Sequence, residues 1–184
     1  GIVQTGIKSY EIPYSLIIVN PSSSITATNV QLSDDLLTTF PTAQSISISS
    51  PVTVSNCTGT TLNVASPAYN GTTQPQLLAG NQNLQPGEQC TVAFTAAVAF
   101  GINPLPSTIQ YNSAIATTAE TPGGKQIAVD LSDDGVVPDT DGNGNASDPG
   151  ENDPTPVDFS SDSLSAVSGK IWLDSNCLLY TSDA

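Results

Sequence analysis

The sequence contains no histidine, no methionine and no arginine. Without histidine, the Ser/His/Asp and Cys/His arrangements that activate a nucleophile are unavailable, and so are zinc sites built on imidazole. Three lysines face 17 Asp and Glu residues, for a net charge of −14. Because duplexes and anionic membranes select clusters of Lys and Arg, this balance excludes nucleic acid as a partner. No apolar run reaches the roughly 18 residues of a spanning helix, so we expect no membrane insertion.

Charged residues of either sign are scarce, at 11% of the chain, which is about half of the usual share. Ser, Thr, Asn and Gln supply the polar surface instead, and these residues favour strands and turns over helices. The 184 residues fit one domain with an appendage, or one domain and the beginning of another. The chain opens at Gly1 without Met and without a visible signal peptide, so we expect a fragment or a processed product.

Apolar residues recur at every second position in several segments, which is the pattern of half-buried strands. In residues 9–20 the inward set is Tyr10, Ile12, Tyr14, Leu16 and Ile18. In residues 89–100 it is Cys90, Val92, Phe94, Ala96 and Val98. Pro13 places the early part of the first of these strands at a sheet edge, since proline cannot donate to a ladder.

Shorter strands are predicted around residues 28–33, 45–55, 61–64, 108–118 and 125–130. In residues 108–118 the larger apolar side chains, Ile109, Tyr111 and Ile115, are predicted to share the core face with Ser113. Strands of this length and spacing predict an all-β, immunoglobulin-like or prealbumin-like β-sandwich of roughly seven to nine strands. No segment shows helical periodicity.

The domain predicted by these strands covers residues 1–159. It includes an acidic loop, rich in Asp, Gly and Asn, at residues 130–158, and Val157 and Phe159 read as a last strand or tether. Residues 160–168 are a linker of small side chains. Residues 169–184 are the C-terminal strand, either the start of a following domain or a strand exchanged with another copy.

Cys57, Cys90 and Cys177 make an odd count. The ending Cys177–Ala184 resembles the translation of a sequencing adapter found at the ends of metagenomic contigs, which would make Asn176 the last natural residue. The natural cysteines are then Cys57 and Cys90, a pair that could close a disulfide in an oxidising compartment. Two unpaired buried thiols are the alternative.

Several segments in order resemble one family. Residues 10–20 (YEIPYSLIIVN), 27–36 (ATNVQLSDDL), 84–95 (LQPGEQCTVAFT) and 111–116 (YNSAIA), with Phe40 and Pro41, are similar to the "conserved repeat" domain of bacterial surface proteins, domain of unknown function eleven. Residues 167–176 (VSGKIWLDSN) resemble the first strand of a B-type, prealbumin-like adhesin repeat. The resemblance implies large secreted proteins that act as stalks, matrix or adhesive layers, with no catalytic residues to carry over.

The acidic loop holds a candidate calcium site. Asp139, Asp141, Asn143 and Asn145 recur every second residue with Gly144 at the sixth position, as in an EF-hand loop. The twelfth position is Gly150, however, so the closing carboxylate, Glu151, comes one residue late. The pattern predicts a weak, extracellular-type calcium site with a Kd of about 10⁻⁴–10⁻³ M. A solvated acidic linker without a bound ion is the alternative.

Three Asn-x-Ser/Thr triplets are candidate glycosylation sites, at Asn56, Asn70 and Asn145. Such triplets also arise by chance in a chain this rich in Asn, Ser and Thr.

Two covalent or catalytic arrangements can be drawn from the remaining polar residues. Lys8 and Asn112 could form an intramolecular isopeptide, with Asp34 or Glu11 as the catalytic acid. Against it, Lys8 can be an exposed lysine and Asn112 a hydrogen-bonded residue at a strand end. Paired carboxylates for glycoside hydrolysis could come from Asp34, Asp35 and Glu88, but aromatic residues to line a cleft make up only 5% of the chain.

The sequence therefore predicts a structural module of an extracellular bacterial surface protein or fibre, and not an enzyme. We expect it to associate with copies of itself or with neighbouring domains. Either residues 1–7 or residues 169–174 could add a strand to a neighbour's sheet edge, unless both belong to adjacent domains of one polypeptide. The alternative function is a carbohydrate-binding or adhesive module, with glycans as partners.

Overall fold

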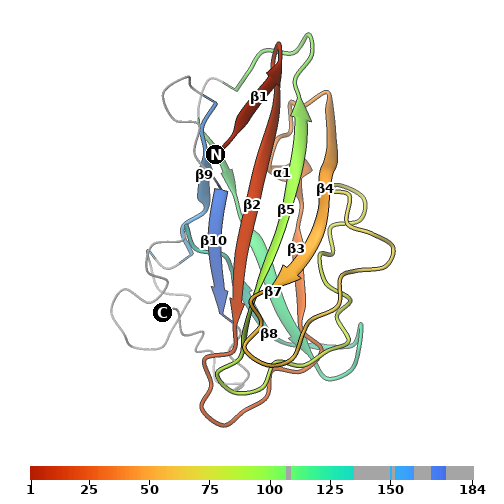
Figure 1. Ribbon diagram of the computed structural model, residues 1–184, viewed down its shortest axis with the longest axis vertical. Helices are drawn as coiled ribbons and strands as arrows, with labels where there is room; N and C mark the ends of the chain where they lie inside the picture. Colours follow the sequence, from red (N-terminus) through yellow and green to blue (C-terminus); the bar gives the residue numbers. More distant parts are fainter. Residues whose placement is uncertain (107–108, 135–149, 151, 160–166, 173–184) are drawn as a thin grey trace.

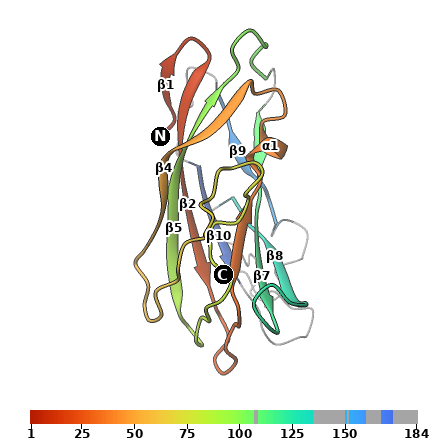
Figure 2. The ribbon, with the colours of Figure 1, turned by 90° about the vertical axis from the view of Figure 1, so that its right-hand side faces the viewer.

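The computed structural model describes residues 1–106, 109–134, 150, 152–159 and 167–172. The chain forms two layers of strands that run along the long axis of the molecule (Figures 1 and 2). The larger sheet has the order β1 (Val3–Gly6), β2 (Ser9–Val19), β5 (Gln89–Ala99) and β4 (Ser45–Ser55), and β10 (Val167–Trp172) also pairs with β2.

The second layer is built from shorter pieces. Its three-stranded sheet has the order β3 (Gln31–Asp34), β7 (Ala114–Ala119) and β8 (Gln126–Leu131), and β6 (Gln110–Asn112) pairs with β9 (Thr155–Val157). The single helix among the described residues, α1 (Leu36–Thr39), spans one turn. The predicted all-β class is confirmed. Within the described part, no helix has the length and apolar character needed to cross a membrane.

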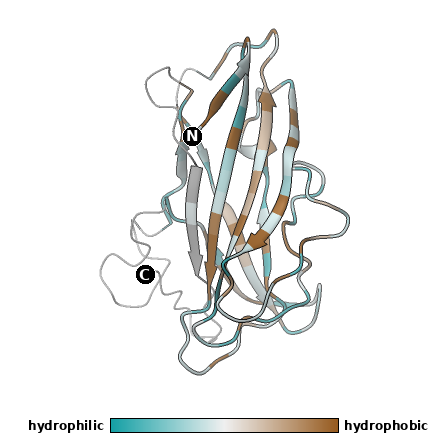
Figure 3. Cartoon of the chain, viewed as in Figure 1, coloured by the Kyte–Doolittle hydropathy of each residue, from teal (hydrophilic) through white to brown (hydrophobic). Residues whose placement is uncertain are grey.

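The core is set by the alternation along β2 and β5, which pair antiparallel over their whole length from Ser9/Ala99 to Val19/Gln89. Both inward sets predicted from the sequence are buried. Tyr14 stacks on Phe94 with ring centroids 4.6 Å apart. Figure 3 shows the resulting change between apolar and polar residues along β2 and β4. Phe159 packs among Tyr10, Phe40 and Phe100, so the predicted tether at the end of the domain enters the core.

The opposite, outward face of the larger sheet carries small side chains. The strand register aligns Ser9, Ala99 and Ser45 in one row across β2, β5 and β4. The remaining rows are Glu11–Ala97–Ser47, Pro13–Thr95–Ser50, Ser15–Ala93–Thr53 and Ile17–Thr91–Ser55. Glu11 is the one charged residue in these five rows, and none of them contains an aromatic ring.

The prediction of a strand at residues 61–64 is wrong. Only Val64 makes a bridge there, with Leu78. The surrounding segment is instead a long loop fixed to β3: Leu77 donates its backbone N–H to Leu32, and Asp34 donates to Pro75. Leu77 and Leu78 are buried. The loop lies beside the edge of β3 because its leucines can reach the core there while its backbone pairs with that strand.

The described residues of the segment predicted at 108–118 form strands with the predicted period but with the opposite face inward. Ile109, Tyr111 and Ile115 are exposed, whereas Asn112 and Ala114 are buried. The prediction assumed that the larger apolar side chains occupy the core. Two aromatic rings, Tyr14 and Phe94, already fill the interior from the larger sheet, so the facing strand contributes small residues.

Both terminal strands pair with β2 of their own chain. β1 lies antiparallel to β2 from Val3/Glu11 to Gly6/Ser9, and β10 lies parallel to it from Val167/Tyr14 to Trp172/Val19. The structure thus places residues 167–172 within the larger sheet, rather than in a following domain or on a neighbouring copy. Pro13 falls between the two paired segments, which agrees with its predicted edge position.

Cys57 and Cys90 are joined in a disulfide, 33 residues apart in the sequence. Cys90 lies near the beginning of β5, and Cys57 lies two residues after the end of β4. The bond therefore fixes the start of the long loop to the centre of the larger sheet.

Candidate functional site

The outer surface of the second layer carries large apolar side chains. Tyr111 exposes 58% of its surface, Ile115 40% and Leu131 39%. These residues come from β6, β7 and β8, whose inward positions hold Asn112 and Ala114. Strand alternation therefore places an apolar surface directly above a buried polar layer.

A pocket of about 540 Å³ opens on this surface. Pro75 and Pro154 extend its apolar wall. Its polar lining comes from β3, from α1 and from the segment between β6 and β7: Ser33, Asp34, Asp35, Thr38, Thr39 and Ser113. The pocket combines one exposed tyrosine with carboxylates and hydroxyls.

Asp35 positions the helical side of the pocket. It is the N-cap of α1: one carboxylate oxygen accepts the Leu37 backbone N–H at 3.0 Å, and the other accepts the Thr38 hydroxyl at 3.2 Å. Capping of this kind satisfies backbone donors that a helix start leaves open. The same turn brings Thr39 against Asn112.

Asp34, Asn112 and Thr39 form a buried chain of hydrogen bonds beneath the pocket. The Asn112 Nδ2 donates to Asp34 Oδ2 at 3.0 Å, and the Thr39 hydroxyl donates to Asn112 Oδ1 at 2.7 Å. All three residues are buried. The chain ties β3, α1 and β6 together across 78 residues of sequence.

The second oxygen of Asp34 makes no hydrogen bond within the described part of the chain, and neither do the buried hydroxyls of Tyr14 and Tyr69. Burial raises the pKa of Asp34 from 3.8 to about 7; the hydrogen bond from Asn112 opposes this rise, and the charge of Asp35 adds to it. Burial and the charge of Asp34 also raise the pKa of Tyr14. A carboxyl group with this pKa is partly protonated at neutral pH.

The three carboxylates considered for glycoside hydrolysis do not share one site. Asp34 and Asp35 line the pocket, whereas Glu88 accepts the backbone N–H groups of Thr60 at 3.0 Å and Gln85 at 2.8 Å. These two bonds, that from Gln85 first, lower the pKa of Glu88. Glu88 fastens the turn before β5 to the segment that follows the disulfide.

The structure also contradicts an isopeptide bond between Lys8 and Asn112. Asp34 does lie against Asn112, as the catalytic acid would, but the Lys8 ammonium donates to the Asn103 carbonyl at 3.1 Å. Lys8 sits in the turn between β1 and β2 with a φ of 56°, and it pairs through its carbonyl with Phe100. The lysine and the asparagine therefore have separate partners.

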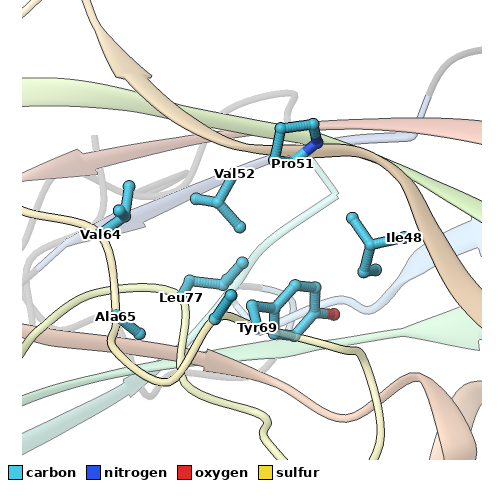
Figure 4. Close-up of a pocket in the computed structure, with 8 residues that line it drawn as sticks. Ile48, Pro51, Val52, Val64, Ala65, Tyr69 and Leu77 are labelled. Carbon is cyan, nitrogen blue, oxygen red and sulfur yellow. The ribbon is translucent and has the colours of Figure 1, made fainter.

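A second hollow, of about 270 Å³, lies between β4 and the long loop. Ile48 and Val52 of β4 face Tyr69 and Leu77 of the loop across it (Figure 4). Apart from the Tyr69 hydroxyl, these side chains are hydrocarbon. The hollow is a gap in the packing of the loop against the sheet edge, and it offers no set of polar groups to orient a ligand.

Two of the three glycosylation candidates can be placed. Asn56 is exposed at the end of β4, with a φ of 51°. Asn70 is partly buried, and its side chain is used inside the loop: its amide donates to Thr73, and its oxygen accepts the N–H groups of Thr72 and Gln74. Of these two, Asn56 is the more accessible to modification. Asn145 lies outside the described residues.

The predicted calcium ligands Asp139, Asp141, Asn143, Asn145 and Glu151 also lie outside the described residues. Within the part that is described, no group of three or more carboxylate or thiol side chains is arranged around a common metal position. The backbone N–H of Asp153 donates to Asp133 at 3.1 Å, which brings the two ends of the acidic segment together.

Sequence reasoning missed the pocket because it placed Tyr111 and Ile115 in the core. One feature of the sequence indicated the opposite orientation: Asn112, Ala114 and Ala116 also recur at every second position. A strand whose inward residues are small can face a layer of aromatic rings. Hydrophobicity alone does not separate these two phases. The comparison with known proteins adds no further constraint, since no protein family, curated protein or solved structure matches this chain.

Proposed function

We propose that this chain is a structural module of an extracellular bacterial surface protein or fibre, without enzymatic activity, which associates with copies of itself or with neighbouring domains. The outward face of the larger sheet carries this proposal. Its five rows hold mainly Ser, Thr and Ala, with one carboxylate and no aromatic ring. Because the side chains of this face are short and nearly all uncharged, a second surface can approach it closely over its whole area, as sheets do when they stack.

An extracellular location is supported by the disulfide between Cys57 and Cys90. Disulfides persist in oxidising compartments and are reduced in most cytosols. The net charge of −14 on a protein with three lysines adds solubility in a dilute environment.

Edge contacts offer a second route to assembly. Among the described strands, β1 and β4 lie at the two ends of the order of the larger sheet, and β8 lies at one end of the three-stranded sheet. An edge strand presents backbone donors and acceptors to any strand that approaches. Since β1 and β10 occupy the edge of β2, strand addition between copies would use β4, β8 or the outer edge of β1.

Calcium binding at the acidic loop remains part of the proposal. Burial raises the pKa of Asp133; the backbone hydrogen bonds from Asp134 and Asp153 oppose the rise, and the charges of the same two residues add to it. A divalent cation bound by the acidic loop would offset the repulsion among these carboxylates.

Self-association can be tested by sedimentation equilibrium on the full chain. Thr95→Lys places a charge in the central row of the outward face, on the middle strand β5 and opposite Pro13. Ser23→Lys adds the same charge at an exposed turn position, and serves as the matched control. We expect the wild type and Ser23→Lys to associate with equal affinity, and Thr95→Lys to remain monomeric with an unchanged circular dichroism spectrum. Equal association of all three proteins would argue against the face.

A carbohydrate-binding function is the second candidate, and the pocket beside Tyr111 favours it. An exposed aromatic ring next to Asp35 and the Thr38 hydroxyl can stack on a sugar and bond its hydroxyls. A glycan array with wild type and Tyr111→Ala tests this function. A defined glycan bound by monomeric wild type and lost in the variant would make binding, rather than assembly, the main role.

A further inference from the structure

The first and last described strands share one edge of β2. β1 pairs with the beginning of β2, at Ser9, Tyr10 and Glu11, and β10 pairs with its second half, from Tyr14 to Val19. Figure 1 shows β1 and β10 one after the other along this edge. Their directions differ, because β1 is antiparallel and β10 parallel to β2. The two strands therefore respond differently to a pull on the chain.

β10 is seated in a narrow slot. Gly169, in its centre, is buried, and a Cβ atom added there would lie 3.0 Å from the Asp133 carbonyl oxygen and 3.3 Å from Leu16 Cδ2. Leu16 belongs to β2, and Asp133 follows β8 of the second layer. A Cβ atom there would be tighter than ordinary van der Waals contact and would displace its neighbours by a few tenths of an ångström. β10 contacts both layers at the side of the sandwich.

The parallel direction fixes how tension acts on the pair. A pull on the chain before β2 acts toward the start of β2, and a pull on the chain after β10 acts toward the end of β10. In a parallel pair these directions are opposite and lie along the strands, so the hydrogen bonds of all six residue pairs resist together. In the antiparallel β1–β2 hairpin, the same pull separates one residue pair after another, beginning at Val3 and Glu11.

We propose that the β2–β10 pair is a shear clamp that transmits tension through the module, and that β1 is released first at low force. This inference rests on the proposed function, since only a module linked to others in a fibre or surface protein is pulled from both sides. Gly169 determines how firmly β10 is seated, and so it sets the resistance of the clamp.

Single-molecule force spectroscopy on the full chain tests the proposal, with genetically fused handles at both ends. We expect a small first event, from release of β1, and then one dominant rupture. Gly169→Ala crowds the Asp133 carbonyl oxygen and Leu16, and we expect an unfolding rate under load about tenfold faster. Gly6→Ala is the matched control, because its nearest neighbour would be Ser9 Cβ at an ordinary 3.6 Å. An unchanged rate for Gly169→Ala would overturn the clamp.

A second pulling geometry separates the clamp from a general loss of stability. The C-terminal handle is moved to Thr121→Cys, in the exposed turn between β7 and β8, on a Cys177→Ser background. The load then does not pass through β10. We expect the Gly169→Ala variant to unfold under load at the same rate as the protein without this substitution. Equal sensitivity in both geometries would mean that the substitution weakens the whole fold, and the clamp would be rejected. These measurements use single molecules, so their outcome is independent of whether the protein self-associates.

Discussion

The buried carboxyl group of Asp34 makes the stability of this protein depend on pH in an unusual direction. Asp34 exposes 2% of its surface, and burial raises its pKa from 3.8 to about 7. The folded state thus holds the Asp34 proton more tightly than the unfolded state does. The favourable contribution is complete below about pH 4, falls as the pH rises through 7, and is then lost.

The size of the effect follows from the difference between the two pKa values. Each unit corresponds to about 1.4 kcal/mol, so a rise of about three units removes about 4 kcal/mol of stability between pH 4 and pH 8. Asp34→Asn removes the titration while keeping the shape of the side chain and an oxygen to accept the bond from Asn112. We expect Asp34→Asn to match the wild type near pH 4 and to be more stable by about 4 kcal/mol at pH 8.

Urea denaturation of the oxidised protein, at intervals from pH 4 to pH 8, measures this difference. The high negative charge also changes with pH, but it changes nearly alike in both proteins and leaves their difference intact. Asp35→Asn is the control: it removes the same charge from an exposed N-cap, and Asn caps a helix about as well as Asp. A difference between Asp34→Asn and the wild type that stays constant from pH 4 to pH 8 would refute the raised pKa.

Three further outcomes can be measured on the same protein. Reduction of the Cys57–Cys90 disulfide should cost about 3–4 kcal/mol on the loop-entropy estimate, seen as a lower urea midpoint with reductant, and an unchanged midpoint would show that the closed loop does not restrict the unfolded chain. Glu88→Ala removes the acceptor of two backbone N–H groups near the surface and should cost about 0.5–1.5 kcal/mol, with Glu88→Gln between it and the wild type; because the pKa of Glu88 is lowered, its contribution should be present at neutral pH and lost in acid. Calcium should protect residues 130–158 from protease without changing the unfolding midpoint of the core, whereas identical cleavage with and without chelator would indicate a linker without a bound ion.

The long strands could be predicted from the sequence because their two faces differ so clearly. In β2 and β5 every second residue is apolar and buried, and most of the others are small or polar, so period and phase agree. Residues 110–116 carry apolar groups on both faces, and the sequence gives the period but not the phase. Space in the core decides there: Tyr14 and Phe94 occupy it from the larger sheet, and Ala114 and Ala116 are what fits.

For a related reason, the candidate site could not be predicted from local sequence patterns. Asp34 and Asn112 are 78 residues apart, and nothing in either segment specifies that the two side chains meet. The one-turn helix α1 was missed as well, since it is too short to show a period and is held by the Asp35 cap and its contact with β6. The return of β10 to β2 likewise depends on a slot made by Leu16 and Asp133, which six residues of sequence do not reveal.

The larger sheet is reinforced from both sides, and the two reinforcements act on different parts of the chain. On the β4 side, the disulfide ties Cys57 to β5 and closes the long loop that covers β3. On the β2 side, β10 holds the sheet to the second layer through the slot at Gly169. The disulfide restricts the unfolded chain and so acts on equilibrium stability. The β2–β10 pair lies between the points where tension enters and leaves, and so it acts on the rate of unfolding under load. A module joined to others in a fibre needs both properties, because its core must persist outside the cell and its ends must not separate when the fibre is stretched.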